Sequence, residues 1–267
     1  MFRLSPRLNL RQAAAVEIEV LGNGGGLGEP TTSIRVGDEV LFDAGSGLEA
    51  LEDGRVQQIR RVYLTHAHAD HISALPLLIE TLFEEGPGPG VEVFGLPEVL
   101  NVLRTHVFNG LVWPDFEKIP DEKKGFLRLT ELACGKSISD PSGISLTPFA
   151  TRHGVPSCGY GITFPSGRRL ALTGDTGYDE VLVESLNELG GLDVLCTECS
   201  YAVGDTEKAM RFGHLTPELV QRIVAGLRVS PKEVWVGHFK PRFKGVVEAE
   251  LRDSGFIIPS PGYLRSF

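Results

Sequence analysis

The sequence contains few cysteines and lacks any long apolar run. Its 267 residues include four cysteines, at positions 134, 158, 196 and 199, which are too few for a disulfide scaffold in a chain of this length. No apolar run approaches the roughly 18 residues that a membrane span needs. Residues 1–11 are polar and have no apolar signal-peptide centre. We therefore expect a cytoplasmic protein that does not enter a membrane.

The chain also has fewer basic residues than acidic ones. Lysine and arginine number 26 against 35 aspartates and glutamates, so the formal net charge is −9. A non-specific binder of long nucleic acid usually needs a basic face, and the acidic balance argues against this class of protein. It leaves open a small phosphorylated substrate held by metal ions.

Short strand patterns and amphipathic helix patterns alternate along the chain, without an internal repeat or a composition break. The 42% hydrophobic content can bury a large core, and the length favours one domain over residues 1–267. We expect a mixed α/β domain. The expected strands are 16–20, 31–36, 39–43, 61–65, 91–94, 145–149, 160–164, 170–173, 193–197 and 233–236, and the expected helices are 72–82, 97–107, 179–189 and 216–227.

A cluster of histidines follows the expected strand 61–65. The stretch 65–71 reads THAHADH, with three imidazoles and one carboxylate within six residues. In an extended backbone, residues two apart point the same way, so His66 and His68 can bind one ion together. Asp70 and His71 can then face a second ion beside it. Imidazole and carboxylate suit zinc, manganese or iron, and this pattern favours a metal site over a solvated polar turn.

Three further candidates stand alone at expected strand ends. His153, Asp175 and His238 each follow a strand and each lie next to a glycine, which lets the backbone approach a site closely. One histidine at a strand end is usually structural or exposed. Three such positions in a chain that also carries the cluster favour additional metal ligands.

Together these residues resemble the metallo-β-lactamase superfamily, which carries His-x-His-x-Asp-His, a lone His, a lone Asp and a final His in this order. The resemblance spans about residues 17–238. It implies an α/β fold in the form of a four-layer αββα sandwich, with two divalent metal ions at one edge, zinc first and manganese or iron as alternatives. Carried over by position, His66, His68 and His153 bind the first ion, Asp70, His71 and His238 bind the second, and Asp175 bridges both.

The resemblance extends to Asp43, which lies in a segment similar to the family's early strand. In the family this aspartate supports the metal site, so Asp43 is expected to orient a ligand. A turn carboxylate before Gly45 is the alternative interpretation.

Within the superfamily, two branches that cut phosphodiesters fit best. Lactamases proper are disfavoured because many of them lack a histidine at the position of His71. Segments 107–115, 198–201 and 214–217 look like those of class II cyclic-nucleotide phosphodiesterases. The tRNA 3′-processing endonucleases share the later pattern, but their long arm rich in glycine and basic residues is not visible here. We also keep a thioester or lactone hydrolase and a non-catalytic scaffold as alternatives.

The expected reaction is hydrolysis of a cyclic nucleotide, such as 3′,5′-cyclic AMP, or of a similar small phosphodiester. A hydroxide between the two ions attacks phosphorus, oriented by Asp70 or Asp175. The resemblance gives His214 a proton-donor or phosphate-contact role, with Glu198 orienting it or holding it protonated; their alternatives are an exposed helix-start histidine and a surface carboxylate. The resemblance also makes a homodimer plausible.

A few other residues have open interpretations. Cys196 and Cys199 have the spacing of redox and zinc sites, but no second pair exists, and we expect a structural role. Asn109, Trp113 and Phe116 are candidates for lining a pocket, since aromatic rings stack on nucleobases. Core packing is the alternative for Trp113.

Overall fold

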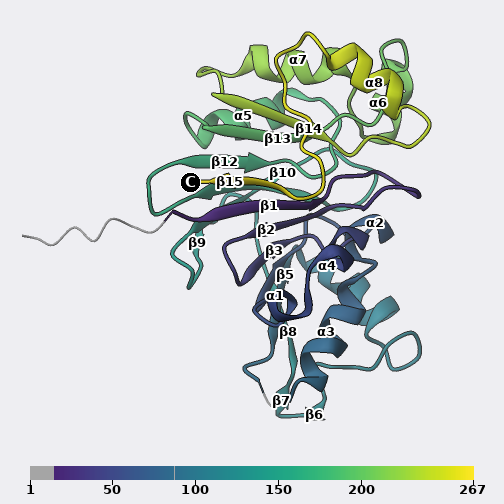
Figure 1. Cartoon of the computed structure of the whole chain (residues 1–267), viewed down its shortest axis with the longest axis vertical. Helices are drawn as coiled ribbons and strands as arrows, with labels where there is room; N and C mark the ends of the chain where they lie inside the picture. Colours follow the sequence, from purple (N-terminus) through teal and green to yellow (C-terminus); the bar gives the residue numbers. More distant parts are fainter. Residues whose placement is uncertain (1–14, 87) are drawn as a thin grey trace, which may run out of the picture.

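Two β-sheets pack face to face, and helices cover the outer face of each (Figure 1). The computed structural model describes residues 15–86 and 88–267. The prediction of a four-layer αββα sandwich is confirmed. The polar stretch 1–11 lies outside the described residues. Within the described part of the chain, no helix is both long and apolar enough to span a bilayer.

The first sheet has seven strands in the order β15-β1-β2-β3-β4-β5-β8. The four strands from β3 to β8 run parallel to one another, whereas β1 pairs antiparallel with both of its neighbours. Their bounds are β1 Glu17–Gly22, β2 Ser33–Val36, β3 Val40–Phe42, β4 Arg61–Tyr63, β5 Val91–Gly95, β8 Leu127–Glu131 and β15 Tyr263–Ser266.

The second sheet has six strands in the order β14-β13-β12-β11-β10-β9. Strands β12, β13 and β14 are parallel, and β10 runs in the same direction because β11 is antiparallel to both β10 and β12. The bounds are β9 Ile138–Ser139, β10 Ser145–Ala150, β11 Cys158–Thr163, β12 Arg169–Leu172, β13 Val194–Glu198 and β14 Glu233–Gly237, and a separate hairpin pairs β6 Pro120–Asp121 with β7 Lys124–Gly125.

Aromatic and branched side chains fill the space between the two sheets. Tyr63 of β4 stacks on Phe94 of β5 with ring centroids 4.5 Å apart, and Tyr160 of β11 meets the edge of Phe42 at 5.3 Å. These rings and Trp235 are buried. Burial of such large apolar surfaces from both sheets holds the two halves of the chain together.

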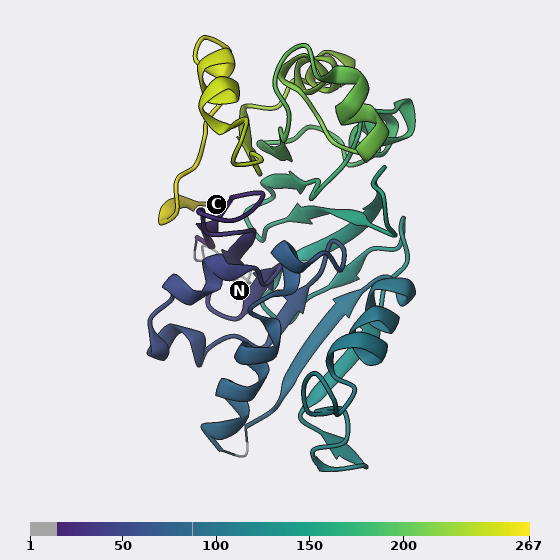
Figure 2. The ribbon, with the colours of Figure 1, turned by 90° about the vertical axis from the view of Figure 1, so that its right-hand side faces the viewer.

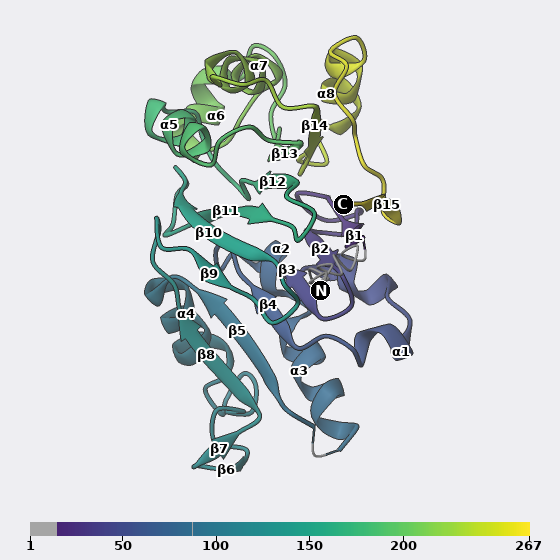
Figure 3. The same cartoon turned by 90° about the vertical axis from the view of Figure 1, so that its left-hand side faces the viewer.

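The helices divide between the two outer faces in sequence order. Figure 3 shows α1 and α3 outside the first sheet, and α5 to α8 outside the second; α8 lies beside α7 (Figure 2). Helix α5 begins where its sequence provides an N-cap, since the Asp179 side chain accepts a 2.7 Å hydrogen bond from the Leu182 amide. The bounds are α1 Asp53–Val56, α2 Ala69–Ile72, α3 Leu75–Glu84, α4 Pro97–Val102, α5 Glu180–Glu188, α6 Thr206–Phe212, α7 Pro217–Gly226 and α8 Lys244–Leu251, with a 3₁₀ turn at Ser46–Ala50 and a π turn at Leu103–Val107.

The structure differs from the expected elements mainly at helix boundaries. The expected helix 72–82 begins later, at Leu75 in α3, because Pro76 is accommodated in the first turn of that helix, and Ile72 instead ends the short helix α2. The expected elements do not include the short elements α1, β6, β7 and β9, or β8, β15, α6 and α8.

Strand direction brings several loops to one edge of the sandwich. Strands β10, β12, β13 and β14 all run the same way, so the loops after them emerge at the same edge of the second sheet. The loop after β4 of the first sheet meets them there, as the hydrogen bond from the Cys158 amide to the Thr65 carbonyl shows. Chain segments far apart in sequence are thereby placed next to one another.

Candidate metal centre

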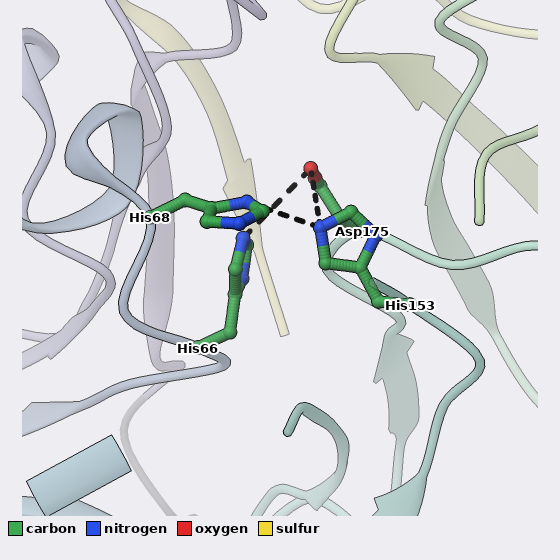
Figure 4. A group of neighbouring side chains, drawn as sticks. All are labelled: His66, His68, His153 and Asp175. Carbon is green, nitrogen blue, oxygen red and sulfur yellow. Dashed lines mark hydrogen bonds and ion pairs between the residues drawn. The ribbon is translucent and has the colours of Figure 1, made fainter. Parts of the chain in front are cut away.

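All nine predicted site residues gather at this shared edge. Figure 4 shows His66 and His68 on one side and His153 and Asp175 on the other, with ring nitrogens and carboxylate oxygens turned toward one another. The positions follow from the fold, because each residue lies in, shortly after or shortly before an element that has one end at this edge. His66 and His68 follow β4, Asp70 and His71 lie in α2, His153 follows β10, Asp175 follows β12, Glu198 ends β13, His214 precedes α7 and His238 follows β14.

The first group consists of three histidines and one oxygen of Asp175. The Nδ1 atom of His68 lies 3.1 Å from Nε2 of His153. Oδ2 of Asp175 lies 3.8 Å from Nε2 of His153 and 3.9 Å from Nε2 of His66. These atoms surround a common point.

The second group faces the other oxygen of the same carboxylate. Oδ1 of Asp175 lies 3.3 Å from Nε2 of His71 and 3.2 Å from Nε2 of His238. The two ring nitrogens are 3.2 Å apart, and Oδ2 of Asp70 lies 3.2 Å from Nε2 of His238. The Asp175 carboxylate therefore stands between two sets of ligand-type atoms, with one oxygen toward each.

Both groups fit divalent cations. Two atoms bound tetrahedrally to zinc at 2.0–2.1 Å lie about 3.3 Å apart, which is the spacing within the second group. Nε2 of His66 and Oδ1 of Asp175 are buried and have no hydrogen-bond partner among the described residues. Such orphaned polar atoms are costly inside a protein, and a cation at each centre would satisfy them.

The ring nitrogens that face away from the two centres have partners of their own. His66 Nδ1 lies 3.0 Å from the Thr65 hydroxyl, His71 Nδ1 lies 2.7 Å from Oδ2 of Asp43, and His153 Nδ1 lies 3.0 Å from the Gly213 carbonyl. Each outer nitrogen can donate its proton to an oxygen. The inner nitrogens thus keep their lone pairs for a cation, which is how proteins orient histidine ligands.

Asp43 supports this edge from behind. Its fully buried carboxylate accepts hydrogen bonds from both the amide and the hydroxyl of Thr65, each at 2.8 Å, and meets His71. Asp43 also has φ 55°, in the left-handed region that non-glycine residues rarely adopt. These contacts favour the orienting role over the turn carboxylate before Gly45.

Burial and neighbouring charges shift the titration of these groups. Burial lowers the pKa of His66, His68 and His153, so their rings are neutral at pH 7. Burial alone would raise the pKa of Asp70 and Asp175, but the facing histidines lower it in both cases. The two carboxylates therefore remain ionised, as ligands must.

His214 and Glu198 form a pair beside the two groups. Nδ1 of His214 lies 2.6 Å from Oε1 of Glu198 and 4.0 Å from Oδ2 of Asp175. Burial alone would lower the pKa of His214, but the Glu198 carboxylate raises it. Both side chains are buried, so the alternatives of an exposed histidine and a surface carboxylate are wrong. The Glu198 carboxylate also accepts hydrogen bonds from the amides of Thr176, Ser200 and Leu215.

Other sequence expectations have mixed outcomes. Phe116 is buried in the core between α3 and the first sheet, so its assignment to a pocket is wrong. Trp113 packs against the same core, and the Asn109 side chain bonds its own loop. Cys196 and Cys199 are buried free thiols, and burial raises the pKa of Cys196 to about 12. A buried thiol of this kind is inert, as the structural interpretation expects.

The residues that sequence reasoning missed are the partners of the histidines. Thr65 and Ser200 touch ring nitrogens, and Asn23 holds the backbone of His238 through a 2.7 Å hydrogen bond. Ser200 lies within the segment 198–201 that resembles a family motif, which was the available signal. The signal for Asn23 was the glycine-rich loop in which it lies.

Comparison with known proteins gives consistent matches to one superfamily. A family model described as "Beta-lactamase superfamily domain" matches residues 38–239. The 3′,5′-cyclic-nucleotide phosphodiesterase 1 of Saccharomyces cerevisiae is 33% identical over 99 residues, covering 37% of this chain and 26% of that protein. Ribonuclease Z of Pyrococcus horikoshii is 30% identical over 154 residues, covering 54% of this chain and 47% of that protein. These two matches thus span less than half of each relative.

A third relative matches over a longer range. Ribonuclease Z of Kineococcus radiotolerans is 26% identical over 263 residues, covering 81% of this chain and 79% of that protein.

Two solved structures share the fold. Unliganded yeast PDE1 aligns with a TM-score of 0.73 at 22% identity, covering 89% of this chain and 93% of that one. The short form of human tRNase Z aligns with a TM-score of 0.65 at 21% identity, covering 93% and 98%. At these sequence identities the alignments show a shared fold and nothing about function. Since the family model covers well over half of the sequence, the chain belongs to the beta-lactamase superfamily.

Proposed function

We propose that this protein is a metal-dependent phosphodiesterase that uses two zinc ions to hydrolyse a 3′,5′-cyclic nucleotide or a similar small phosphodiester. The observation that carries the proposal is the position of Asp175, whose two oxygens face two separate sets of ring nitrogens. A bridging carboxylate between paired centres suits the charged, in-line displacement at a phosphodiester. The relatives named as a cyclic-nucleotide phosphodiesterase and as ribonuclease Z support this class of reaction.

The cations would be held by the residues of the two groups. His66, His68 and His153 hold the first, and Asp70, His71 and His238 hold the second, with Asp175 shared. When bound, two divalent cations neutralise phosphoryl oxygens and make water acidic enough to supply a nucleophile near neutral pH. At His71, Asp175 and Asp43 raise the pKa although burial would lower it, and a bound cation would take the place of the second ring proton.

Three carboxylates and one histidine orient the attacking water and supply a proton to the leaving group. Asp70, which is partly exposed, and Asp175 accept protons of the attacking water in hydrogen bonds and so orient it. His214 donates a proton to the departing ribose oxygen. Glu198 keeps the His214 ring protonated and fixed in orientation, since it accepts the Nδ1 proton at 2.6 Å.

A second candidate function is endonucleolytic cleavage at tRNA 3′ ends. It is favoured by the length of the match to ribonuclease Z, which covers 79% of the Kineococcus protein. The net charge of −9 favours the small substrate over a long polyanion. Both candidates use the same residues and differ in what docks against them.

One side-by-side assay tests the proposal. The zinc-loaded protein is given 3′,5′-cyclic AMP, a 2′,3′-cyclic nucleotide, a precursor tRNA and a thioester under the same conditions, with and without a chelator. We expect chelator-sensitive hydrolysis of the cyclic nucleotides. Cleavage of the tRNA alone would favour the second candidate. Hydrolysis of the thioester alone would overturn the phosphodiesterase assignment.

A further inference from the structure

The Ser200 hydroxyl lies in the small gap between His238 and His214. Its Oγ atom is 3.2 Å from Nδ1 of His238, 3.0 Å from the carbonyl oxygen of His238 and 3.3 Å from Nδ1 of His214. The residue is fully buried. A hydroxyl with no access to solvent must direct its one proton and its lone pairs at these neighbours.

The pairing of two parallel strands brings Ser200 to this place. In the register of β13 and β14, Glu198 lies opposite Gly237, and the Cys199 amide donates a 2.8 Å hydrogen bond to the Gly237 carbonyl. His238 directly follows β14, and Ser200 is the second residue after β13. A shift of this register would separate them, so the sheet itself sets the contact.

The hydrogen bonds assign a direction to each proton. The Ser200 hydroxyl donates to the His238 carbonyl, which uses its only proton, so Oγ accepts from the neighbouring ring nitrogen. His214 directs its own Nδ1 proton to Glu198, at the shorter distance of 2.6 Å. The proton that Ser200 accepts is therefore the Nδ1 proton of His238. Nε2 of His238 then carries a lone pair, and this is the atom that faces Asp70 and Asp175.

The same hydroxyl also restrains the backbone of His238. His238 has φ 56°, a left-handed conformation that costs a non-glycine residue energy and persists only where its surroundings enforce it. Its amide donates a 2.7 Å hydrogen bond to the Asn23 carbonyl, and its carbonyl accepts from Ser200. Both peptide groups of His238 are thus held in place.

We propose that Ser200 is a positioning residue that fixes the ring tautomer and the backbone of His238, and so prepares the second metal site. This inference rests on the proposed function, because that site is assigned to a metal there. Residues that hold a histidine ligand from behind typically change metal affinity by about 10- to 100-fold when they are removed. Ser200 acts through His238 and needs no contact with substrate.

The test compares Ser200→Ala with a matched control, Ser33→Ala. Ser33 is also fully buried, and its hydroxyl donates only to the carbonyls of Thr32 and Gly45. Zinc affinity is measured by competition with a coloured chelator, without any substrate. We expect Ser200→Ala to bind its second zinc ion about 10- to 100-fold more weakly while the first ion and the control stay unchanged. Equal affinities in the two variants, or equal loss of both ions, would overturn the proposal.

A second measurement uses the wild-type protein alone and does not depend on how the variant folds. A proton–nitrogen spectrum of the zinc-loaded protein should show a slowly exchanging proton on Nδ1 of His238. A proton on Nε2 instead would overturn the assignment. Neither measurement involves hydrolysis, so a wild-type protein that cleaves no phosphodiester would refute the proposed function without deciding the role of Ser200.

Discussion

The Nδ1 atom of His214 lies 2.6 Å from Oε1 of Glu198, and both side chains are buried at the edge where the ligand-type residues meet. This contact engages the Nδ1 atom of the His214 ring. A buried carboxylate that binds one ring nitrogen both orients the imidazole and stabilises its protonated form. This pairing suits His214 to proton donation, and the same ring also lies with Asp175 and His238 in a set of ligand-type atoms, so the metal content of a His214 variant separates the two roles.

We expect His214→Ala to retain its zinc and to lose most of its activity. Loss of a general acid typically costs about 10²- to 10⁴-fold in rate. The loss should be large for a cyclic nucleotide, whose alkoxide leaving group needs a proton, and small for a nitrophenyl phosphodiester, whose leaving group does not. Elemental analysis and rates with both substrates check this expectation. Loss of zinc from the variant would show that His214 is a ligand instead.

Removing the Glu198 charge should move the pH dependence of activity. The carboxylate raises the pKa of His214, and the protonated acid is lost as the pH rises through that raised pKa. In Glu198→Gln the pKa of His214 falls, so activity should decline at lower pH than in the wild-type protein. Rate profiles from pH 5 to 10 measure the shift, with Glu218→Gln as the control because Glu218 is an exposed residue of α7. An unmoved alkaline limb would contradict the pairing.

Asp43→Asn should weaken binding at the second site. The variant keeps the shape of the side chain but removes the charge that faces His71 at 2.7 Å. A loss of about 10- to 100-fold in affinity for one zinc ion is expected, measured by chelator competition. Asp38→Asn is the matched control, since the Asp38 side chain is 75% exposed and pairs with Arg35. Unchanged affinity in Asp43→Asn would argue that this aspartate only shapes the turn.

Asp140→Asn should destabilise the fold without changing zinc content. The buried Asp140 carboxylate accepts hydrogen bonds from the Tyr63 hydroxyl at 2.7 Å and from Nε of Arg61 at 2.8 Å. Hydrogen bonds to charged groups contribute about 1.5–3 kcal/mol, and urea unfolding should show a loss of this size. Glu39→Gln is the control, since the Glu39 side chain is 51% exposed and its pairing with Arg61 should contribute less than about 1 kcal/mol.

The Asp140 effect should also depend on pH. Burial alone would raise the pKa of Asp140, but its bonds to Ser142, Tyr63 and Arg61 lower it. The unfolded-state pKa is about 3.9. The stabilisation is therefore fully present above about pH 4 and is lost as the pH falls through the folded-state pKa. A difference between wild type and Asp140→Asn that grows on acidification would contradict this assignment.

The sequence predicted which polar residues gather at one edge better than it predicted the elements around them. The stretch 65–71 places its candidate ligands next to one another, so short-range spacing was enough to find them. His153, Asp175 and His238 were found through strand ends and through the resemblance, because nothing local distinguishes a ligand from any other polar residue at a strand end. Ser200 could not be found in this way, since its contact depends on how β13 and β14 pair. Strand register is a long-range property that a single sequence encodes only weakly.

Elements at the periphery were missed for a different reason. Strand β8, with the sequence LRLTE, is short and half polar, and it forms because the edge of the first sheet offers β5 as a partner. Helices α6 and α8 are only seven and eight residues long. Helices of this length are marginal on their own and depend on tertiary packing, which no local pattern reveals.

The candidate ligands come from loops of both sheets. Along the sequence they extend from His66 to His238. Any cation held there is a non-covalent cross-link between the two halves of the sandwich. Ligand binding to the native state alone adds about 2.7 kcal/mol when the free ligand is at a hundred times its dissociation constant. Removal of the cations would then lower the resistance of the whole chain to heat and to proteases, and not only its activity.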